Sequence, residues 1–201
     1  MVLKEVFGTL YPSLGDSTMD RLLHCAKAMQ ISKGEVLIEA GEQPSCVMVL
    51  EEGILRGYLP GMGGKDVTDC FYHRYGTVIS GRSSLNDPSL LRVEALTPCR
   101  VLLLPASEVR ELMDKDMVIL RAYNRVLSHA LDRHWEEKLL LHRCTAMERY
   151  LWFLKEYPGL IDQVNNRYIA SFLNMTPVTL SRLRRQIREN EAAENEAAET
   201  E

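Results

Sequence analysis

Arginines crowd one short stretch near the end of the 201-residue chain. Residues 182–188, "RLRRQIR", contain four of them. A guanidinium group can donate two parallel hydrogen bonds to a phosphate, or to the O6 and N7 atoms of guanine. The residues just before, "TPVTLS", add hydroxyl groups and the apolar side chain of Val178. Such a set of groups is typical of a protein surface that contacts DNA.

These side chains need a rigid element to present them, and the sequence predicts two helices joined by a tight turn. Small and apolar residues would form the inner face of the first helix: Ile169, Ala170 and Leu173. Asn174 occupies the position that requires a left-handed backbone, where Asn is the best choice after Gly. Thr176 is a good N-cap and Pro177 a good first residue for the second helix. The pattern predicts a helix-turn-helix.

The second helix divides into two faces. Leu180, Leu183 and Ile187 repeat at helical spacing and would be buried. The other face resembles a recognition helix, whose first turns meet base edges while its arginines also meet phosphates. The residues predicted to bind DNA are Thr176, Pro177, Val178, Thr179, Ser181, Arg182, Arg184, Arg185 and Arg188. Arg182 is the best candidate for a bidentate contact to guanine. An amphipathic hairpin with merely solvated arginines is the alternative.

Charge is distributed unevenly along the chain, although the net value is only −4. Residues 143–188 hold eight Lys and Arg against three Asp and Glu, whereas residues 189–201 hold six Glu and no basic residue. A basic segment therefore lies between an acidic body and an acidic tail. This asymmetry indicates an anionic partner for residues 143–188.

The first half of the chain predicts a helix followed by a β domain. Residues 1–30 look helical, with an apolar stripe at Met19, Leu22, Leu23 and Ala26 after the capping candidates Asp16 and Ser17. From Ile31 to Leu104 short apolar runs are broken by glycine, for example "EVLIEAGE", "CVMVLEEG" and "CRVLLLP". Many short strands with frequent turns suggest a sandwich or a jelly-roll barrel.

Residues 107–142 contain no Gly or Pro and predict one long helix. Two apolar rows run along this helix, and one of them contains Ile119, Tyr123, Val126 and Ala130. A helix that is apolar on two faces packs against two partners, here its own barrel and a twin subunit. Burial within one monomer is the alternative. The predicted dimer seam is a heptad pattern: Met113, Met117, Leu120, Asn124, Leu127 and Leu131, continuing through His134, Lys138 and Leu141.

The order of barrel, long helix and helix-turn-helix resembles the Crp/Fnr family of bacterial transcription regulators. "KGEVLIEAGEQPSCVMVLEEGILRGYLPGMGGKDVT" is similar to the family's cyclic-nucleotide-binding jelly roll. "ERYLWFLKEYPGLIDQVNNRYIASFLNMTPVTLSRLRRQ" resembles a branch common in Bacteroidetes-like bacteria. The resemblance implies an α+β fold: an N-terminal β jelly roll (a double-stranded β-helix) with flanking helices, a long dimerisation helix and a C-terminal helix-turn-helix. It also implies a homodimer on double-stranded DNA, with RNA polymerase as a candidate partner.

The sequence departs from the family in its sensor. Members that bind cyclic AMP have a Gly-Glu pair and an Arg-Ser/Thr-Ala run, but Ser89, Leu90 and Leu91 stand where that run is expected. A cyclic phosphate without its arginine would lose a charge-assisted contact worth about 1.5–3 kcal/mol. We therefore expect no response to cyclic AMP, and the barrel either senses another small molecule or only supports dimerisation. A different effector pocket could use Arg82, Ser83, Ser84 and Arg92.

The end of the chain also departs from the family. Many members place Glu and Arg where this chain has Pro177 and Val178, and Val178 can offer only an apolar contact, such as one to a thymine methyl. Longer relatives continue into a β-hairpin wing, whereas here "ENEAAENEAAETE" follows directly, so no wing is evident. This tail is either a solvated extension or a set of glutamates that competes with DNA for the arginines.

Other classes of protein fit less well. The five cysteines are scattered, which argues against disulfides, zinc and an iron–sulfur cluster. His73 or Cys70 as a haem ligand is a weak alternative, and "GMGGKD" fits a hairpin turn rather than a phosphate loop. No metal site, cofactor or catalytic constellation is predicted. The chain has no apolar run of about 20 residues and no signal-peptide layout at its start, so we expect a cytoplasmic protein without a membrane partner.

These observations divide the chain into four expected parts. They are a cyclic-nucleotide-binding-like sensor domain over residues 1–110, a dimerisation helix over 111–141, a helix-turn-helix domain over 142–188 and an acidic tail over 189–201. The predicted function is sequence-specific DNA binding as a homodimer, with an unknown small-molecule effector or none. The alternative is a ligand-binding or protein-docking module that has lost DNA binding.

Overall fold

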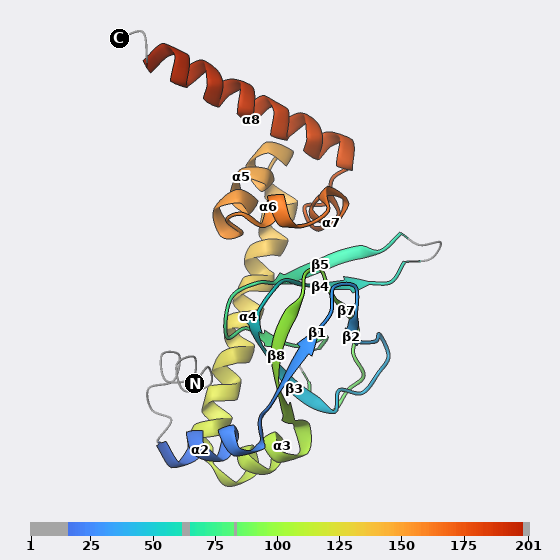
Figure 1. The fold of residues 1–201 in the computed structure, drawn as a ribbon, viewed down its shortest axis with the longest axis vertical. Coiled ribbons are helices and arrows are strands. Elements are labelled where there is room, and N and C mark those ends of the chain that lie inside the picture. The colour runs from blue at the N-terminus through green and yellow to red at the C-terminus, as the bar shows by residue number, and fades with distance from the viewer. Residues whose placement is uncertain (1–15, 62–64, 83, 199–201) are drawn as a thin grey trace. The chain divides into compact units, whose positions relative to one another are not determined.

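The computed structural model describes residues 16–61, 65–82 and 84–198, and Figure 1 shows the fold. The chain separates into two compact units, residues 1–133 and residues 134–201. The boundary falls within helix α4 (Met117–Arg143), which contributes to both units.

Two four-stranded antiparallel sheets build the first unit (Figure 1). Their strand orders are β1-β8-β3-β6 and β2-β7-β4-β5. The strands are β1 (Lys27–Ile31), β2 (Val36–Ile38), β3 (Cys46–Glu52), β4 (Leu55–Leu59), β5 (Val67–Tyr72), β6 (Val78–Ile79), β7 (Arg92–Ala95) and β8 (Cys99–Pro105). Non-sequential strand neighbours in both sheets are those of a jelly roll, which confirms the predicted β architecture.

Alternation along the strands places one set of side chains between the two sheets. Leu50 of β3, Leu55 of β4, Val93 of β7 and Val101 of β8 are completely buried and belong to one apolar cluster. Gly53 makes the β3–β4 turn with a φ of 101°, and a Cβ there would come within 2.5 Å of Cys99 Sγ. The glycine-broken runs of the sequence therefore correspond to strands that share one core.

The predicted N-terminal helix is shorter than expected. Helix α2 spans Asp16–Cys25, and Met19 and Leu22 are buried as predicted. The expectation of helix up to residue 30 was wrong at its end, because Lys27–Ile31 form β1 and pair with β8 along its length. Pairing with a distant strand outweighs local preference here. The part of the predicted helix over residues 1–15 lies outside the described residues.

The prediction of one long helix over residues 107–142 was also wrong, because this segment forms two helices. Helix α3 (Ala106–Lys115) ends at Asp116, whose backbone is extended, and α4 begins at Met117. The Asp116 carboxylate accepts a hydrogen bond from the Val118 N–H at 2.9 Å, so Asp116 caps α4. Ile119 and Ala122 of α4 then pack with Leu112 of α3 in a second apolar cluster of the first unit.

Five helical segments build the second unit: the end of α4, α5 (Ala146–Glu156), α6 (Leu160–Gln163), α7 (Asn166–Phe172) and α8 (Pro177–Ala198). Thr145 and Glu148 form a capping box at the start of α5. The Glu148 carboxyl accepts hydrogen bonds from the Thr145 N–H and hydroxyl, which lowers its pKa. Stacked aromatic rings fill the centre, with Phe153 and Tyr157 centroids 4.9 Å apart.

Candidate nucleic-acid interface

The turn between α7 and α8 has the geometry that the sequence predicts. Asn174 has a φ of 49° and is the one non-glycine residue with positive φ among the described residues. The Met175 N–H donates to the Ala170 carbonyl at 2.9 Å, and the Asn174 N–H donates to the Ser171 carbonyl at 3.1 Å. These two bonds form a Schellman motif, which ends α7 and reverses the chain.

The start of α8 is fixed by a cap. The Thr179 N–H donates to Thr176 Oγ1 at 3.1 Å, and the two threonine hydroxyls lie 2.9 Å apart. Pro177 is the first residue of α8, where its missing N–H costs nothing. The hydroxyls of Thr176 and Thr179 thus already hold the helix end, in addition to any contact with DNA.

Tight packing joins the two helices. Ile169, Ala170 and Leu173 have no exposed surface, and neither has Leu180 of α8. Leu183 and Ile187 are half-buried on the same side of α8. The side chain of Ala170 is small enough for the helices to approach closely, so the predicted inner faces are confirmed.

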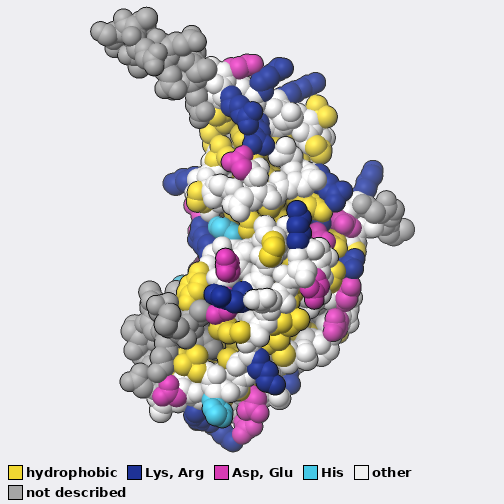
Figure 2. All heavy atoms as spheres, viewed as in Figure 1, with side chains coloured by type: hydrophobic (Ala, Val, Ile, Leu, Met, Phe, Trp, Pro, Cys, Tyr) yellow, Lys and Arg dark blue, Asp and Glu magenta, His cyan; other side chains and the backbone are white. Residues whose placement is uncertain are grey.

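Polar and basic side chains form the opposite face of α8. Val178 is 60% exposed and the Arg185 side chain 76% exposed, while Ser181, Arg182 and Arg188 are also exposed. Figure 2 shows Lys and Arg side chains gathered beside the grey end of the chain, over α8. We call Val178, Ser181, Arg182, Arg185 and Arg188 the basic face. Its groups can donate to phosphates and base edges.

Arg184 departs from this arrangement. Its guanidinium lies 2.7 Å from Asp162 Oδ1 of α6 and donates at 3.4 Å to Asn166 Oδ1 of α7. Only 23% of its side chain is exposed. The sequence pattern predicts Arg184 to be among the DNA-binding arginines. Its partners could not be recognised from the sequence, because they lie 18 and 22 positions earlier.

The predicted tail is helical up to Ala198. It therefore continues the axis of α8 instead of turning back after Arg188. At 1.5 Å per residue, Ala198 lies about 15 Å beyond Arg188 along the helix. Glu189, at the start of the tail, contacts an arginine, with its Oε1 3.5 Å from Arg185 Nε. Within residues 177–198 the chain forms one helix and no strand, so no wing is found there.

The predicted effector residues have separate partners. Arg82 Nε lies 3.7 Å from Asp87 Oδ2, and Arg92 donates to Glu39 Oε1 at 2.9 Å. The Ser84 hydroxyl accepts from the Asn86 N–H, and Ser83 lies outside the described residues. Arg92 lies on the sheet face opposite to the buried Val93, because neighbouring residues of a strand point to opposite faces. In this structure Arg82 and Arg92 each pair with a different carboxylate, and an effector pocket that uses either of them stays a prediction.

The segment that replaces the cyclic-phosphate residues closes on itself. Ser89 is 3% exposed and its hydroxyl donates to the Leu91 carbonyl at 2.6 Å. The Ser89 backbone also exchanges hydrogen bonds with Gly41 and Glu42. A Cβ on Gly81 would come within 1.7 Å of Ser89 Oγ. Ser89 therefore forms hydrogen bonds within its own chain, at the position where cyclic-AMP-binding members are expected to have their anion-binding run.

Sequence reasoning missed a buried arginine on the sheet that also contains Arg92. Arg56 of β4 is 2% exposed, donates to Thr68 Oγ1 at 2.9 Å and to Glu94 Oε1 at 3.0 Å, and lies over the Tyr58 ring. Burial, followed by the charge of Glu94, raises the pKa of Tyr58. Cross-strand register brings these residues together, with Arg56 opposite Glu94. The available signal was the two-residue spacing of Arg56 and Tyr58 in a predicted strand, which places both on one face of the sheet.

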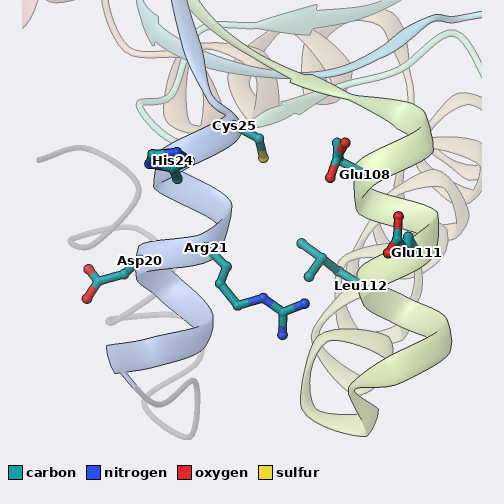
Figure 3. Close-up of a pocket in the computed structure, with 7 residues that line it drawn as sticks. All are labelled: Asp20, Arg21, His24, Cys25, Glu108, Glu111 and Leu112. Atoms are coloured by element: carbon teal, nitrogen blue, oxygen red, sulfur yellow. The ribbon is translucent and has the colours of Figure 1, made fainter.

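A shallow hollow of about 450 Å³ lies between α2 and α3 of the first unit. Figure 3 shows Arg21 reaching between the two helices, with Cys25 on its own helix and Glu108 and Leu112 opposite. Burial raises the pKa of the Cys25 thiol, which disfavours a reactive thiolate. None of the predicted effector residues lines this hollow.

The predicted dimer seam is divided between two helices. Met113 belongs to α3 and packs in the second apolar cluster, so it does not continue the pattern of α4. On α4, Met117 and Leu131 are 60% and 58% exposed, Asn124 is exposed, and Leu120 and Leu127 are half-buried. Trp135 and Leu139 are also about half exposed, at four-residue steps from Leu131. The predicted heptad pattern did not include Trp135 and Leu139, because it placed the neighbouring residues His134 and Lys138 in the seam.

Among the described residues, none of the helices combines the length and the apolar content that crossing a membrane demands. A model of the cyclic nucleotide-binding domain matches residues 28–116. A search of curated protein sequences gives no match.

Several solved structures resemble most of the chain. FixK2 from Bradyrhizobium japonicum has a TM-score of 0.76 and 25% identity, covering 83% of this chain and 86% of that one. A protein described as a transcriptional regulator of the Crp/Fnr family from Eubacterium rectale has a TM-score of 0.68 and 13% identity, covering 90% and 87%. The catabolite activator protein of Thermus thermophilus has a TM-score of 0.55 and 17% identity, covering 90% and 87%. Residues 28–116 therefore resemble the cyclic nucleotide-binding domain, and the chain shares its fold with FixK2 and with a regulator described as a Crp/Fnr-family member.

Proposed function

We propose that this protein is a sequence-specific DNA-binding transcription regulator that acts as a homodimer in the cytoplasm. One observation carries the proposal: a capped helix, packed on the helix before it, exposes Arg182, Arg185 and Arg188 on one face. A helix of this kind fits the major groove of B-DNA, which is about 12 Å wide. The fold shared with Crp/Fnr-type regulators supports this use of α8.

Dimerisation is supported by α4. Met117, Leu131, Trp135 and Leu139 each expose half or more of their surface, which is unusual for large apolar side chains on one helix. A second copy of α4 would cover them. A two-fold dimer would then present two copies of α8 to half-sites about one helical turn apart.

The jelly roll would act without cyclic AMP in this proposal. Its interior is occupied by its own side chains, among them Tyr72, whose hydroxyl donates to the Ser80 carbonyl at 2.5 Å. Arg82, the one arginine between residues 76 and 91, is exposed and faces Asp87. Another small-molecule effector and RNA polymerase remain candidate partners, and no catalytic role is proposed.

Selection of fragmented genomic DNA by the purified full-length protein tests the proposal, near physiological salt and without added ligand. We expect enrichment of a palindrome, the operator, whose half-sites lie about one helical turn apart. Cyclic AMP should not change the enrichment. The Arg182→Ala variant should lose about 1–3 kcal/mol of binding at one base position.

Three results would each count against one part of the proposal. Equal loss by Arg182→Ala on operator and random DNA would make Arg182 a phosphate contact. No enrichment with or without cyclic AMP, together with no retention on heparin at moderate salt, would favour a docking module that has lost DNA binding. Enrichment that needs cyclic AMP would overturn the statement on the jelly roll.

A further inference from the structure

Arg184 is placed differently from the other arginines of α8. It follows Leu183 and precedes Ile187 by one turn, so it flanks the buried side of the helix. Its side chain is 23% exposed, compared with 76% for Arg185. An arginine at the edge of a helix-packing interface can join neighbouring elements, whereas one on the exposed face cannot.

The contacts of Arg184 join α8 to both preceding helices. One guanidinium nitrogen lies 2.7 Å from Asp162 Oδ1 of α6, and the other lies 3.4 Å from Asn166 Oδ1 at the start of α7. The bond to Asp162 is charge-assisted and therefore stronger than a neutral one. Leu180, Leu183 and Ile187 hold α8 by apolar contacts, which leave the rotation of a helix less well defined than a directional bond does.

We propose that Asp162 is a positioning residue for DNA recognition, which orients the basic face of α8 by holding Arg184. Arg184 is then a strut inside the second unit and not a contact to DNA. This inference rests on the proposed function, because a strut matters only where the orientation of α8 decides an affinity. Base contacts tolerate displacements of only about 0.5 Å, so a small rotation of α8 weakens them.

The sign of the effect separates this proposal from a simple charge effect. Asp162 is 70% exposed and negatively charged, so as a bystander it would repel phosphates. Its removal would then strengthen binding to any DNA. As a positioning residue, its removal weakens binding to the operator and leaves binding to random DNA unchanged or slightly stronger.

The test uses full-length Asp162→Asn, Arg184→Gln and the double variant, with affinities for the operator and for a random duplex measured at several salt concentrations. We expect Asp162→Asn to lose about three- to fivefold on the operator alone, the size typical of a partly exposed ion pair. Arg184→Gln should lose no more in the Asp162→Asn background. The salt dependence should not change. Glu136→Gln, which removes a charge from an exposed position on α4, is the matched control and should not weaken operator binding.

Two results would overturn the proposal. Stronger binding of Asp162→Asn to both DNAs would make Asp162 a bystander charge. A decrease of about 0.9 in the salt slope for Arg184→Gln would make Arg184 a phosphate contact.

Amide hydrogen exchange of the free protein keeps the strut testable if the wild-type protein selects no DNA. In Asp162→Asn we expect faster exchange over residues 177–188, with the melting temperature within a few degrees of wild type. Unchanged exchange there would overturn the strut. Faster exchange in a protein that binds no DNA would support the strut, while the proposed function itself would fail.

Discussion

Val178 is the apolar residue of the basic face, and it can form no hydrogen bond to DNA through its side chain. It exposes 60% of its surface on the first turn of α8, where recognition helices meet base edges. The thymine C5 methyl is the apolar group that the major groove presents. We therefore expect Val178→Ala to weaken operator binding about fourfold, the value for burying one of the two methyl groups that the substitution removes.

The contact can be located by combining the variant with modified DNA. Deoxyuridine, which lacks the methyl, is placed at each thymine of the operator in turn, and affinities are measured for wild type and Val178→Ala. At the contacted thymine the two changes should not add, because either one removes the same contact. Additive losses at every thymine would show that Val178 reads no methyl group.

Asn174 is a second residue whose role depends on backbone geometry. Its φ of 49° lies in the region that costs residues with a Cβ about 1–2 kcal/mol, and Asn tolerates it better than most. We expect Asn174→Ala to lower the free energy of unfolding by about 1 kcal/mol and Asn174→Gly to leave it nearly unchanged. Thermal unfolding followed by circular dichroism measures both. Equal effects of Ala and Gly would mean that side-chain contacts, not φ, explain the choice of Asn.

Individual residues of the turn were predictable because their roles are local. Asn174, Thr176 and Pro177 each satisfy a requirement of the backbone within a few residues, and all three are where the sequence places them. Arg184 was not predictable in this way. Its partner Asp162 lies on another helix, and helical spacing alone does not show which residue flanks a packing interface.

At the scale of the element, α8 is long enough to carry both its basic face and the first part of the acidic tail. Glu189 lies one turn after Arg185 and two turns after Arg182, on the same side of the helix. It therefore places a negative charge on the basic face. Residues 190–198 follow the helix away from it.

We expect Glu189→Gln to strengthen DNA binding about threefold at low salt, because it frees Arg185 and removes a charge that repels phosphate. Deletion of residues 190–201 should strengthen binding less, since α8 carries residues 190–198 away from Arg182. Fluorescence anisotropy with a labelled operator at 50 and 200 mM salt measures both changes. A larger effect of the deletion would instead support the hypothesis that the glutamates of the tail compete with DNA for the arginines.

Elements were predictable where local signals agree with the fold. Glycine at the turns and alternation along the runs gave the strands from β2 to β8, apart from the two-residue β6. The predicted helix over 107–142 failed at Asp116, because a polar residue inside a helical pattern is also a good cap. Strand β1 was missed because its residues were assigned to the helix before it, and the pairing with β8 that makes them a strand is not visible in the local sequence.

At the scale of the whole molecule, the exposed apolar side chains of α4 decide whether one chain is the functional unit. Half of the surface of Trp135 and Leu139 and more of Leu131 is open to solvent. Burial of apolar surface stabilises an interface by roughly 25 cal/mol per Å². A second α4 would supply that surface along several turns of helix.

The substitution Leu131→Glu should therefore convert a dimer into a monomer, because two glutamates would face each other across the two-fold axis without a compensating charge. Sedimentation equilibrium at micromolar concentration measures the mass, with Arg125→Glu, an exposed position on the same helix, as the control. Operator affinity should fall at least tenfold with loss of the dimer, since a monomer contacts a single half-site. A Leu131→Glu protein that stays dimeric, with unchanged operator binding, would show that α4 is not the seam and that another surface pairs the two copies of α8.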